Sequence, residues 1–294
     1  LKNTKEHFQD LCTLSWSGLK LSGRSDLHCY FWPVSARFLK EGGRFGFLTS
    51  SSWLDVEYGF TLQAWILQHF KIIAILESID EPWFEDARVK TAVTILERCS
   101  NEKERQENVV KFVRLQKPVK EILGYREHGD EAARQTATDK LRTFIEKTRT
   151  FFENEQLRII PVSQKLLWEE GVQAHTLLSK SKTTVAEDDS DVTEDESTEE
   201  SLADITSDYG AGKWGRFLRA PKLYFRLLEQ YSGRFIKLGE IADIRFGIKS
   251  GCDAFFMPKD VTDDIVEQTN KGLPWNDVGD RKSTRLNSSH ESPS

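Results

Sequence analysis

The sequence contains a single methionine, Met257, and only four scattered cysteines among 294 residues. Since the sequence begins with Leu1 and not with an initiator methionine, we expect the chain to begin inside a longer reading frame. No run approaches the roughly 18 apolar residues of a membrane span, and no basic-then-apolar signal segment opens the chain. No two cysteines have the spacing of a zinc or disulfide framework. These absences predict a cytoplasmic protein with reduced thiols, no metal site and no membrane contact.

The common catalytic motifs are also missing. The sequence has no P-loop, no nucleophile elbow, no His-Glu-x-x-His and no Gly-x-Gly-x-x-Gly. The glycine-rich segment 42–46 precedes a predicted strand, whereas a phosphate cradle lies where a strand runs into a helix. We therefore interpret 42–46 as a turn.

Negative charge is concentrated in one segment. Residues 187–200 (EDDSDVTEDESTEE) hold nine acids, and without them 41 basic residues stand against 38 acidic ones. Such a segment repels itself and cannot bury apolar surface. We interpret it as a disordered linker between two bodies; a DNA-mimicking or partner-binding segment is the alternative.

The first body alternates between helical and strand patterns. Helices are predicted over 26–38 and after Gly59, and strands over 44–49, 72–76, 91–96 and 109–115. This alternation is typical of a doubly wound α/β sheet. Residues 116–186 are interpreted as a helical connector, with a charged helix near 131–154 and a strand near 158–162.

The second body is basic. Between Lys213 and Lys249 nine Lys or Arg stand against three acids. A helix after Pro221 is predicted to turn Leu223, Leu227 and Leu228 inward, together with Tyr224 and Tyr231, and short strands are predicted over 235–238, 241–248 and 254–257. Basic residues beside aromatics fit a surface that contacts phosphates, and an ordinary solvated face fits equally well.

Several ordered blocks of sequence carry a family resemblance. Residues 24–31 (RSDLHCYF), 39–54 (LKEGGRFGFLTSSSWL), 58–59 and 84–93 (FEDARVKTAV) resemble the adenine-specific DNA methyltransferases of restriction–modification and phage-defence systems. Residues 216–221 (RFLRAP) and 238–251 (LGEIADIRFGIKSG) resemble the beginning of the target-recognition domain in large fused enzymes of this kind. The resemblance covers about 1–115 and 205–260.

The resemblance implies a fold class and a domain order. Residues 1–115 would be the C-terminal half of a doubly wound methyltransferase sheet that depends on S-adenosylmethionine. The connector (116–186) and the acidic linker (187–200) would follow, and 201–280 would begin a mixed α+β target-recognition domain. Residues 281–294 are interpreted as a non-native tail, because 280–290 resembles the translation of a sequencing adapter.

Two segments that the family needs are missing. The Gly-rich loop that binds S-adenosylmethionine and the Asn-Pro-Pro-Tyr motif that holds the target adenine would both lie upstream of Leu1. The sequence 80–83 (DEPW) does not replace that motif. We therefore expect no catalytic residue and no bound cofactor in this chain, although the full-length prokaryotic enzyme would use S-adenosylmethionine.

The implied partner is double-stranded DNA, together with restriction or defence-system subunits. Methyltransferases of this family flip the adenine out of the duplex, and aromatic side chains stack on it. Counting back from Val89, the matching aromatic is Phe84, with Trp83 as its alternative. The candidate DNA contacts are Arg219, Lys222, Arg226, Arg245 and Lys249.

Two further expectations concern folding and function. The strand at 45–49 would pair with a missing fourth strand, so it would leave an exposed sheet edge that favours aggregation. A non-enzymatic DNA-specificity subunit remains the main alternative function. A nucleotide-dependent oxidoreductase is compatible with the alternation of helices and strands alone.

The missing segments give a direct prediction. The isolated 294-residue chain should transfer no labelled methyl group from S-adenosylmethionine to DNA, because it lacks both the cofactor loop and the adenine-binding motif. A filter assay on mixed-sequence DNA measures the transfer, and methylation above background would contradict the interpretation.

Overall fold

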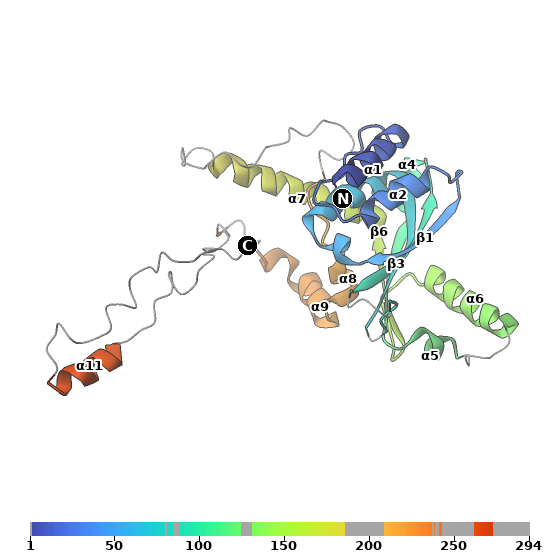
Figure 1. Cartoon of the computed structure of the whole chain (residues 1–294). Helices are drawn as coiled ribbons and strands as arrows, with labels where there is room; N and C mark the ends of the chain where they lie inside the picture. The colour runs from blue at the N-terminus through green and yellow to red at the C-terminus, as the bar shows by residue number, and fades with distance from the viewer. Residues whose placement is uncertain are drawn as a thin grey trace, which may run out of the picture. The chain divides into compact units, whose positions relative to one another are not determined.

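The computed structural model describes residues 2–79, 81–84, 89–124, 131–185, 209–236, 238, 241–242 and 262–272 (Figure 1). The chain divides into two compact units, Leu1–Gln230 and Tyr231–Ser294. The acidic linker, Arg245, Lys249, residues 243–248 of the strand predicted over 241–248, the strand predicted over 254–257 and the tail after 280 fall outside the described ranges, so those predictions stay untested. Within the part of the chain that is described, every helix is too short or too polar to cross a membrane.

The first unit is built on a six-stranded mixed sheet with the strand order β1-β3-β2-β4-β6-β5. The strands are β1 (Arg44–Ser50), β2 (Phe70–Ser78), β3 (Thr91–Arg98), β4 (Val109–Leu115), β5 (Phe152–Glu153) and β6 (Leu157–Ser163). β2 and β4 are parallel, and the other four pairings are antiparallel.

Strand β1 lies at the edge of this sheet. It pairs with β3 from Arg44↔Glu97 to Ser50↔Thr91, and β1 ends the strand order among the described residues. The outer backbone groups of β1 are therefore open to a further strand, as the sequence predicted for 45–49.

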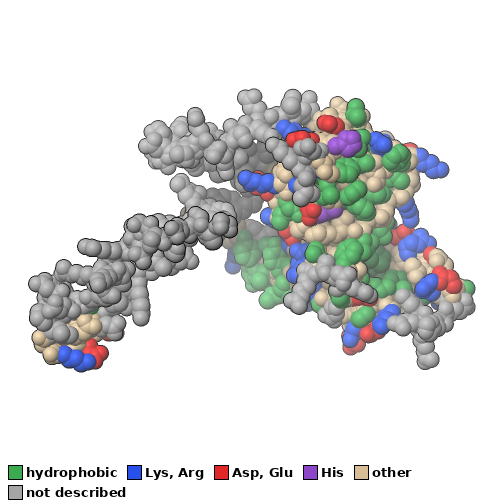
Figure 2. Space-filling model, viewed as in Figure 1, with side chains coloured by type: hydrophobic (Ala, Val, Ile, Leu, Met, Phe, Trp, Pro, Cys, Tyr) green, Lys and Arg blue, Asp and Glu red, His purple; other side chains and the backbone are tan. Residues whose placement is uncertain are grey.

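Helices cover both faces of the sheet. The larger core contains α1 (Lys2–Ser15), α2 (His28–Ala36) and α3 (Phe60–His69), and its largest buried side chains include Trp32, Trp53 and Trp65. A smaller core on the other face contains Ile145 of α6 (Glu131–Lys147), with residues of α5 (Val119–Leu123) packed against it. Acidic and basic side chains are interspersed at the α6 end of this unit (Figure 2).

The remaining elements complete the chain. They are α4 (Glu102–Glu107), α7 (Gln164–Val185), α8 (Gly215–Arg219), α9 (Lys222–Tyr231) and α11 (Thr262–Asn270), and the short 3₁₀ turns η1 (Ser52–Leu54), η2 (Glu57–Gly59) and η3 (Ser232–Arg234). The side chains of 175–185 in α7 lie outside the described residues.

The mixed α/β fold is confirmed, and the strands predicted at 44–49, 72–76, 91–96 and 109–115 form as β1 to β4. The segment 42–46 begins with a turn, in which the Gly42 N–H donates to the Arg98 carbonyl (2.9 Å) at a φ of +72°. Residues 116–186 are more than a connector, because β6 pairs along its full length with β4. The doubly wound arrangement of a whole methyltransferase sheet stays a prediction.

Three predictions for individual segments are wrong. On α9, Leu223 is 61 % exposed and Leu227 and Leu228 are each 39 % exposed, so the predicted inward face is open. The predicted strand at 235–238 does not form at its described residues 235, 236 and 238. The charged helix ends at Lys147, and Phe152 belongs to β5 instead.

The domain boundary also differs from the expected one. Residues 209–230 lie in the first compact unit, so the division falls after Gln230 and not at the acidic linker. Buried Tyr209, Trp214, Phe217 and Leu218 belong to the larger core. The assignment of 201–280 to a target-recognition domain stays a prediction.

A buried lysine marks the smaller core. Lys111 lies on β4 between Val110 and Phe112 of the larger core, so its side chain projects to the opposite face. It is 2 % exposed, and its Nζ has no hydrogen-bond partner among the described residues. Burial, with a smaller contribution from the positive charge of Arg149, lowers the pKa of Lys111 from 10.5 to about 8.

This lysine gives a prediction for stability. In the unfolded chain Lys111 is protonated below pH 10.5, whereas in the folded chain it is protonated only below about pH 8. The burial of its charge therefore lowers the free energy of unfolding, and this destabilisation is fully present below pH 8. Lys111→Met should raise the free energy of unfolding by about 2–3 kcal/mol at pH 7, and the gain should shrink toward pH 10.5.

Urea unfolding across this pH range measures the effect, with Lys40→Met at an exposed lysine as the control. No gain at pH 7, or an equal gain at all pH values, would contradict the prediction.

Candidate functional site

The candidate site lies at one edge of the sheet. β1 and β2 are both antiparallel to β3, and β4 is parallel to β2. The strands β1, β2 and β4 therefore end at the same edge of the sheet. In open α/β sheets ligands bind beyond the carboxyl ends of the strands. We call this edge, with the described residues 50–58 at and after the end of β1 and 77–79 and 81–84 at and after the end of β2, the carboxyl edge.

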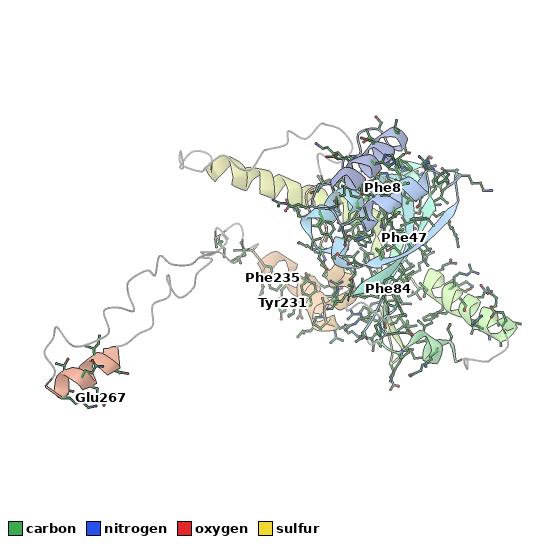
Figure 3. All side chains as sticks on the ribbon, viewed as in Figure 1. Phe8, Phe47, Phe84, Tyr231, Phe235 and Glu267 are labelled. Carbon is green, nitrogen blue, oxygen red and sulfur yellow. The ribbon has the colours of Figure 1, made fainter. Side chains whose placement is uncertain are left out.

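The two predicted stacking residues occupy different environments there. The Trp83 indole N–H donates to Glu81 Oε2 (3.3 Å), and the Trp83 ring packs against the smaller core. Glu81 Oε2 also accepts the N–H of Val119 (2.9 Å). Phe84 is 43 % exposed and lies on the side of the sheet away from Phe8 (Figure 3). Trp83 therefore anchors the loop, and Phe84 has a free ring surface.

A chain of hydroxyl groups follows β1. The Ser50 and Ser52 hydroxyl oxygens are 2.9 Å apart, and the Ser52 hydroxyl is hydrogen-bonded to that of Tyr58. Burial raises the pKa of Tyr58, while its bond to Ser52 works in the opposite direction. Tyr58 thus keeps its proton at neutral pH and fixes the loop after β1.

Arg219 binds both parts of the carboxyl edge. Its Nε donates to both carboxylate oxygens of Glu77 (3.2 and 3.0 Å), and its Nη2 donates to Glu77 Oε1 (2.8 Å) and to Ser51 Oγ (2.9 Å). Its Nη1 donates to Asp55 Oδ2. Glu77 is the penultimate residue of β2 and is only 7 % exposed, so this ion pair is well shielded.

Asp55 also holds the start of α8. Its Oδ1 accepts a hydrogen bond from the Gly215 N–H (3.1 Å), and its backbone carbonyl accepts one from the ammonium of Lys213. A Cβ on Gly215 would lie 2.2 Å from Asp55 Oδ2, so glycine is needed for this approach. One carboxylate therefore contacts both ends of a five-residue helix.

Residues 209–219, here called the strap, are fastened by a buried glutamine. Gln63 of α3 is fully buried, and its Nε2 donates to the carbonyls of Trp53 (2.9 Å), Leu54 (3.2 Å) and Gly212 (2.9 Å). Its Oε1 accepts the hydroxyl of Tyr209 (3.0 Å). The strap thus lies against η1, directly after the end of β1.

The remaining predicted DNA contacts differ from Arg219. The Lys222 ammonium lies 4.9 Å from the ring centroid of Phe151, and Arg226 is exposed on α9. The Arg219 guanidinium binds carboxylates inside the unit, and its predicted contact with DNA stays a prediction. Arg245 and Lys249 lie outside the described residues.

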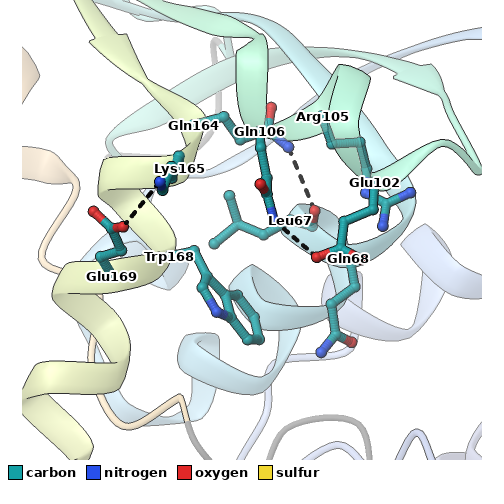
Figure 4. Close-up of a pocket in the computed structure, with 9 residues that line it drawn as sticks. All are labelled: Leu67, Gln68, Glu102, Arg105, Gln106, Gln164, Lys165, Trp168 and Glu169. Carbon is teal, nitrogen blue, oxygen red and sulfur yellow. Dashed lines mark hydrogen bonds and ion pairs between the residues drawn. The ribbon is translucent and has the colours of Figure 1, made fainter.

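A separate cavity of about 370 Å³ lies between α3, α4 and α7 (Figure 4). Trp168, Arg105, Gln106 and Lys165 line it, and Gln164 there donates to the Phe70 carbonyl at the start of β2. It therefore lies at the opposite strand ends from Phe84, so we do not assign it to the site. The described residues contain no group of His, Cys, Asp and Glu suited to a metal ion.

Comparison with known proteins bears on the region that ends at Phe84. Residues 5–84 match the Eco57I restriction-modification methylase family. The match spans α1 through β2 and the loop that carries Trp83 and Phe84. It agrees with the resemblance seen in residues 24–59, and it shows that this region is similar to restriction-modification methylases. It does not test specificity for adenine.

One solved structure is a more distant neighbour. The type IIG restriction endonuclease BpuSI aligns with 78 % of this chain and 25 % of its own, at 12 % identity and a TM-score of 0.38. The chain spans a quarter of the length of that enzyme. Because the TM-score is low, no residue of this chain is given a role from that structure. The comparison with curated proteins gives no match.

Sequence reasoning missed the residues that assemble this edge. Gln63, Asp55 and Glu77 are far from the strap in sequence, and Gln63 is 149 residues from Gly212. One signal was present: Gln63 lies between apolar residues of a helix (LQAWIL), where a buried amide needs partners.

The strap gives a prediction for one glycine. A Cβ on Gly212 would lie 2.0 Å from Gln63 Oε1 and 2.2 Å from the Tyr209 hydroxyl, so Gly212→Ala must break this buried network. We expect a loss of about 2–4 kcal/mol in the free energy of unfolding. Gly23→Ala, with no atom within 4 Å, is the control in the same denaturant titration. Equal stability of the two variants would show that the strap is not packed as described.

Proposed function

We propose that the chain is part of an adenine-specific DNA methyltransferase of a restriction–modification or phage-defence system in a prokaryotic cytoplasm. Within that enzyme it supplies the back half of the catalytic sheet and one wall of the adenine pocket. It also supplies the start of the region that reads the DNA sequence. The match of residues 5–84 to a methylase family carries this proposal.

The pocket wall is assigned to Phe84. A flipped adenine has lost both stacking neighbours, so an exposed aromatic ring at the carboxyl edge stabilises it. Phe84 is 43 % exposed and Trp83 is held by Glu81, which supports Phe84 as the stacking residue and Trp83 as its anchor.

DNA binding is assigned to α9. Lys222 and Arg226 are exposed on this helix, and the carboxylates of Glu77 and Asp55 are occupied by Arg219, so they do not neutralise these two cations. Arg245 and Lys249, which lie outside the described residues, stay predicted DNA contacts. Such contacts to phosphates make affinity depend strongly on salt.

The described residues do not fit S-adenosylmethionine. The glycine-rich turn at 42–43 directs its N–H groups to the carbonyls of Arg98 and Lys40, and it precedes β1. Its amides therefore cannot cradle the cofactor. The cofactor, and any defence-system subunit, would be bound by other parts of the enzyme.

This assignment predicts the effect of removing the exposed ring. Phe84→Ala should weaken binding of the chain to a duplex with one extrahelical adenine by about 5- to 100-fold, since stacking on a base contributes about 1–3 kcal/mol. Phe84→Trp should restore the affinity, and a fully paired duplex should be affected little.

Fluorescence anisotropy measures these affinities. Phe38→Ala is the matched control, because Phe38 is an exposed phenylalanine (76 %) at the end of α2. If Phe84→Ala and Phe38→Ala bind the extrahelical adenine equally well, Phe84 does not stack on the base.

A further inference from the structure

Arg219 differs from its basic neighbours in what its guanidinium touches. Lys222 and Arg226 are exposed, whereas Arg219 is only one-third exposed and binds Glu77, Asp55 and Ser51 at once. A planar guanidinium can bind two carboxylates in fixed directions, which an ammonium cannot.

The three partners come from two separate segments. Ser51 and Asp55 follow β1, and Glu77 is the penultimate residue of β2, seven residues before Phe84. Arg219 itself ends α8, directly before Ala220, Pro221 and α9. One side chain thus connects both parts of the carboxyl edge to the helix that precedes the proposed DNA-binding surface.

We propose that Arg219 is a positioning residue that couples α8 to both segments of the carboxyl edge, so that DNA bound at α9 is sensed at the loop of Phe84. The DNA part rests on the proposed function, whereas the coupling between the two segments does not. Neither part involves a contact between Arg219 and phosphate.

The electrostatics of the site agree with this geometry. Burial alone would lower the pKa of Arg219, but the hydrogen bonds and charges of Glu77 and Asp55 outweigh it and raise the pKa. The guanidinium is therefore charged at every accessible pH. Arg219→Lys keeps the positive charge and removes the planar set of N–H donors. It therefore separates the effect of the guanidinium's geometry from the effect of its charge.

The coupling is tested on the full chain without DNA by amide hydrogen exchange. Arg219→Lys should speed exchange about tenfold in both segments, around Asp55 and around Glu77. Asp55→Asn should also speed exchange near Glu77, and Glu77→Gln should speed exchange near Asp55, because each loosens Arg219. Arg226→Lys on α9 is the matched control and should change neither segment.

A merely local role gives a different pattern. If each carboxylate variant loosens only its own segment, or if Arg219→Lys changes one segment or neither, the coupling is absent and the proposal is overturned. The three substitutions preserve side-chain shape or charge, and far-UV circular dichroism confirms that each variant is folded.

The second arm adds mixed-sequence duplex DNA to the same proteins. Lys222→Met and Arg226→Met should each lower the slope of log affinity against log salt by about 1, and Arg219→Gln, which removes the charge, should leave it unchanged. DNA should slow exchange near Phe84 in the unmodified chain and not in Arg219→Lys.

The outcomes of this arm are distinct. A slope lowered by Arg219→Gln would mean a phosphate contact and would overturn the internal role. Slowing near Phe84 that persists in Arg219→Lys would overturn the sensing. If the unmodified chain binds no DNA, the proposed function and the sensing both fail, and the exchange data without DNA still decide the coupling between the segments.

Discussion

The side-chain amide of Gln63 is the interaction on which the arrangement of the first unit depends. It lies fully buried, donates to three backbone carbonyls and accepts one hydroxyl, and so joins α3, η1 and the strap. A buried amide without partners would cost several kcal/mol, so these segments are specified together. Trp214 adds to this, because its backbone N–H donates to the Leu54 carbonyl and its ring packs against Trp53. Once the strap is in place, Arg219 reaches Glu77 and Asp55.

The position of the strap determines how the carboxyl edge is built. The loop after β1 is held from one side by hydroxyl contacts to Tyr58 and from the other by Arg219. The loop after β2 is held by Glu77 and by Glu81, which binds both Trp83 and the N–H of Val119. Phe84 is left exposed beside these fixed groups. In the proposed function, the fixed groups beside the Phe84 ring reduce the conformational entropy that is lost when an unstacked base binds.

The sequence predicted the parts of the fold that rest on local patterns. β2 and β4 are apolar runs, and the turn at Gly42 needs a positive φ that glycine adopts freely, so these elements were recognised. It could not predict partners that are distant in the chain. Arg219 was interpreted as a DNA contact because a basic residue in a basic stretch gives no sign of a buried carboxylate 142 positions earlier. On α9 the periodicity identified the helix correctly, but periodicity does not show which apolar residues find a partner, and Leu223 does not.

The most direct test of this account is to cut the chain between α7 and the strap. A specific protease site inserted between Asp191 and Val192 would separate the strap covalently from α3 and η1. The account predicts that the two pieces stay together in native size-exclusion chromatography, because buried Tyr209, Trp214 and Leu218 and the Gln63 network remain intact. The Gly210 N–H also keeps its hydrogen bond to the Gly171 carbonyl in α7. Separation of the pieces under native conditions would contradict the claim that the strap is part of the first unit.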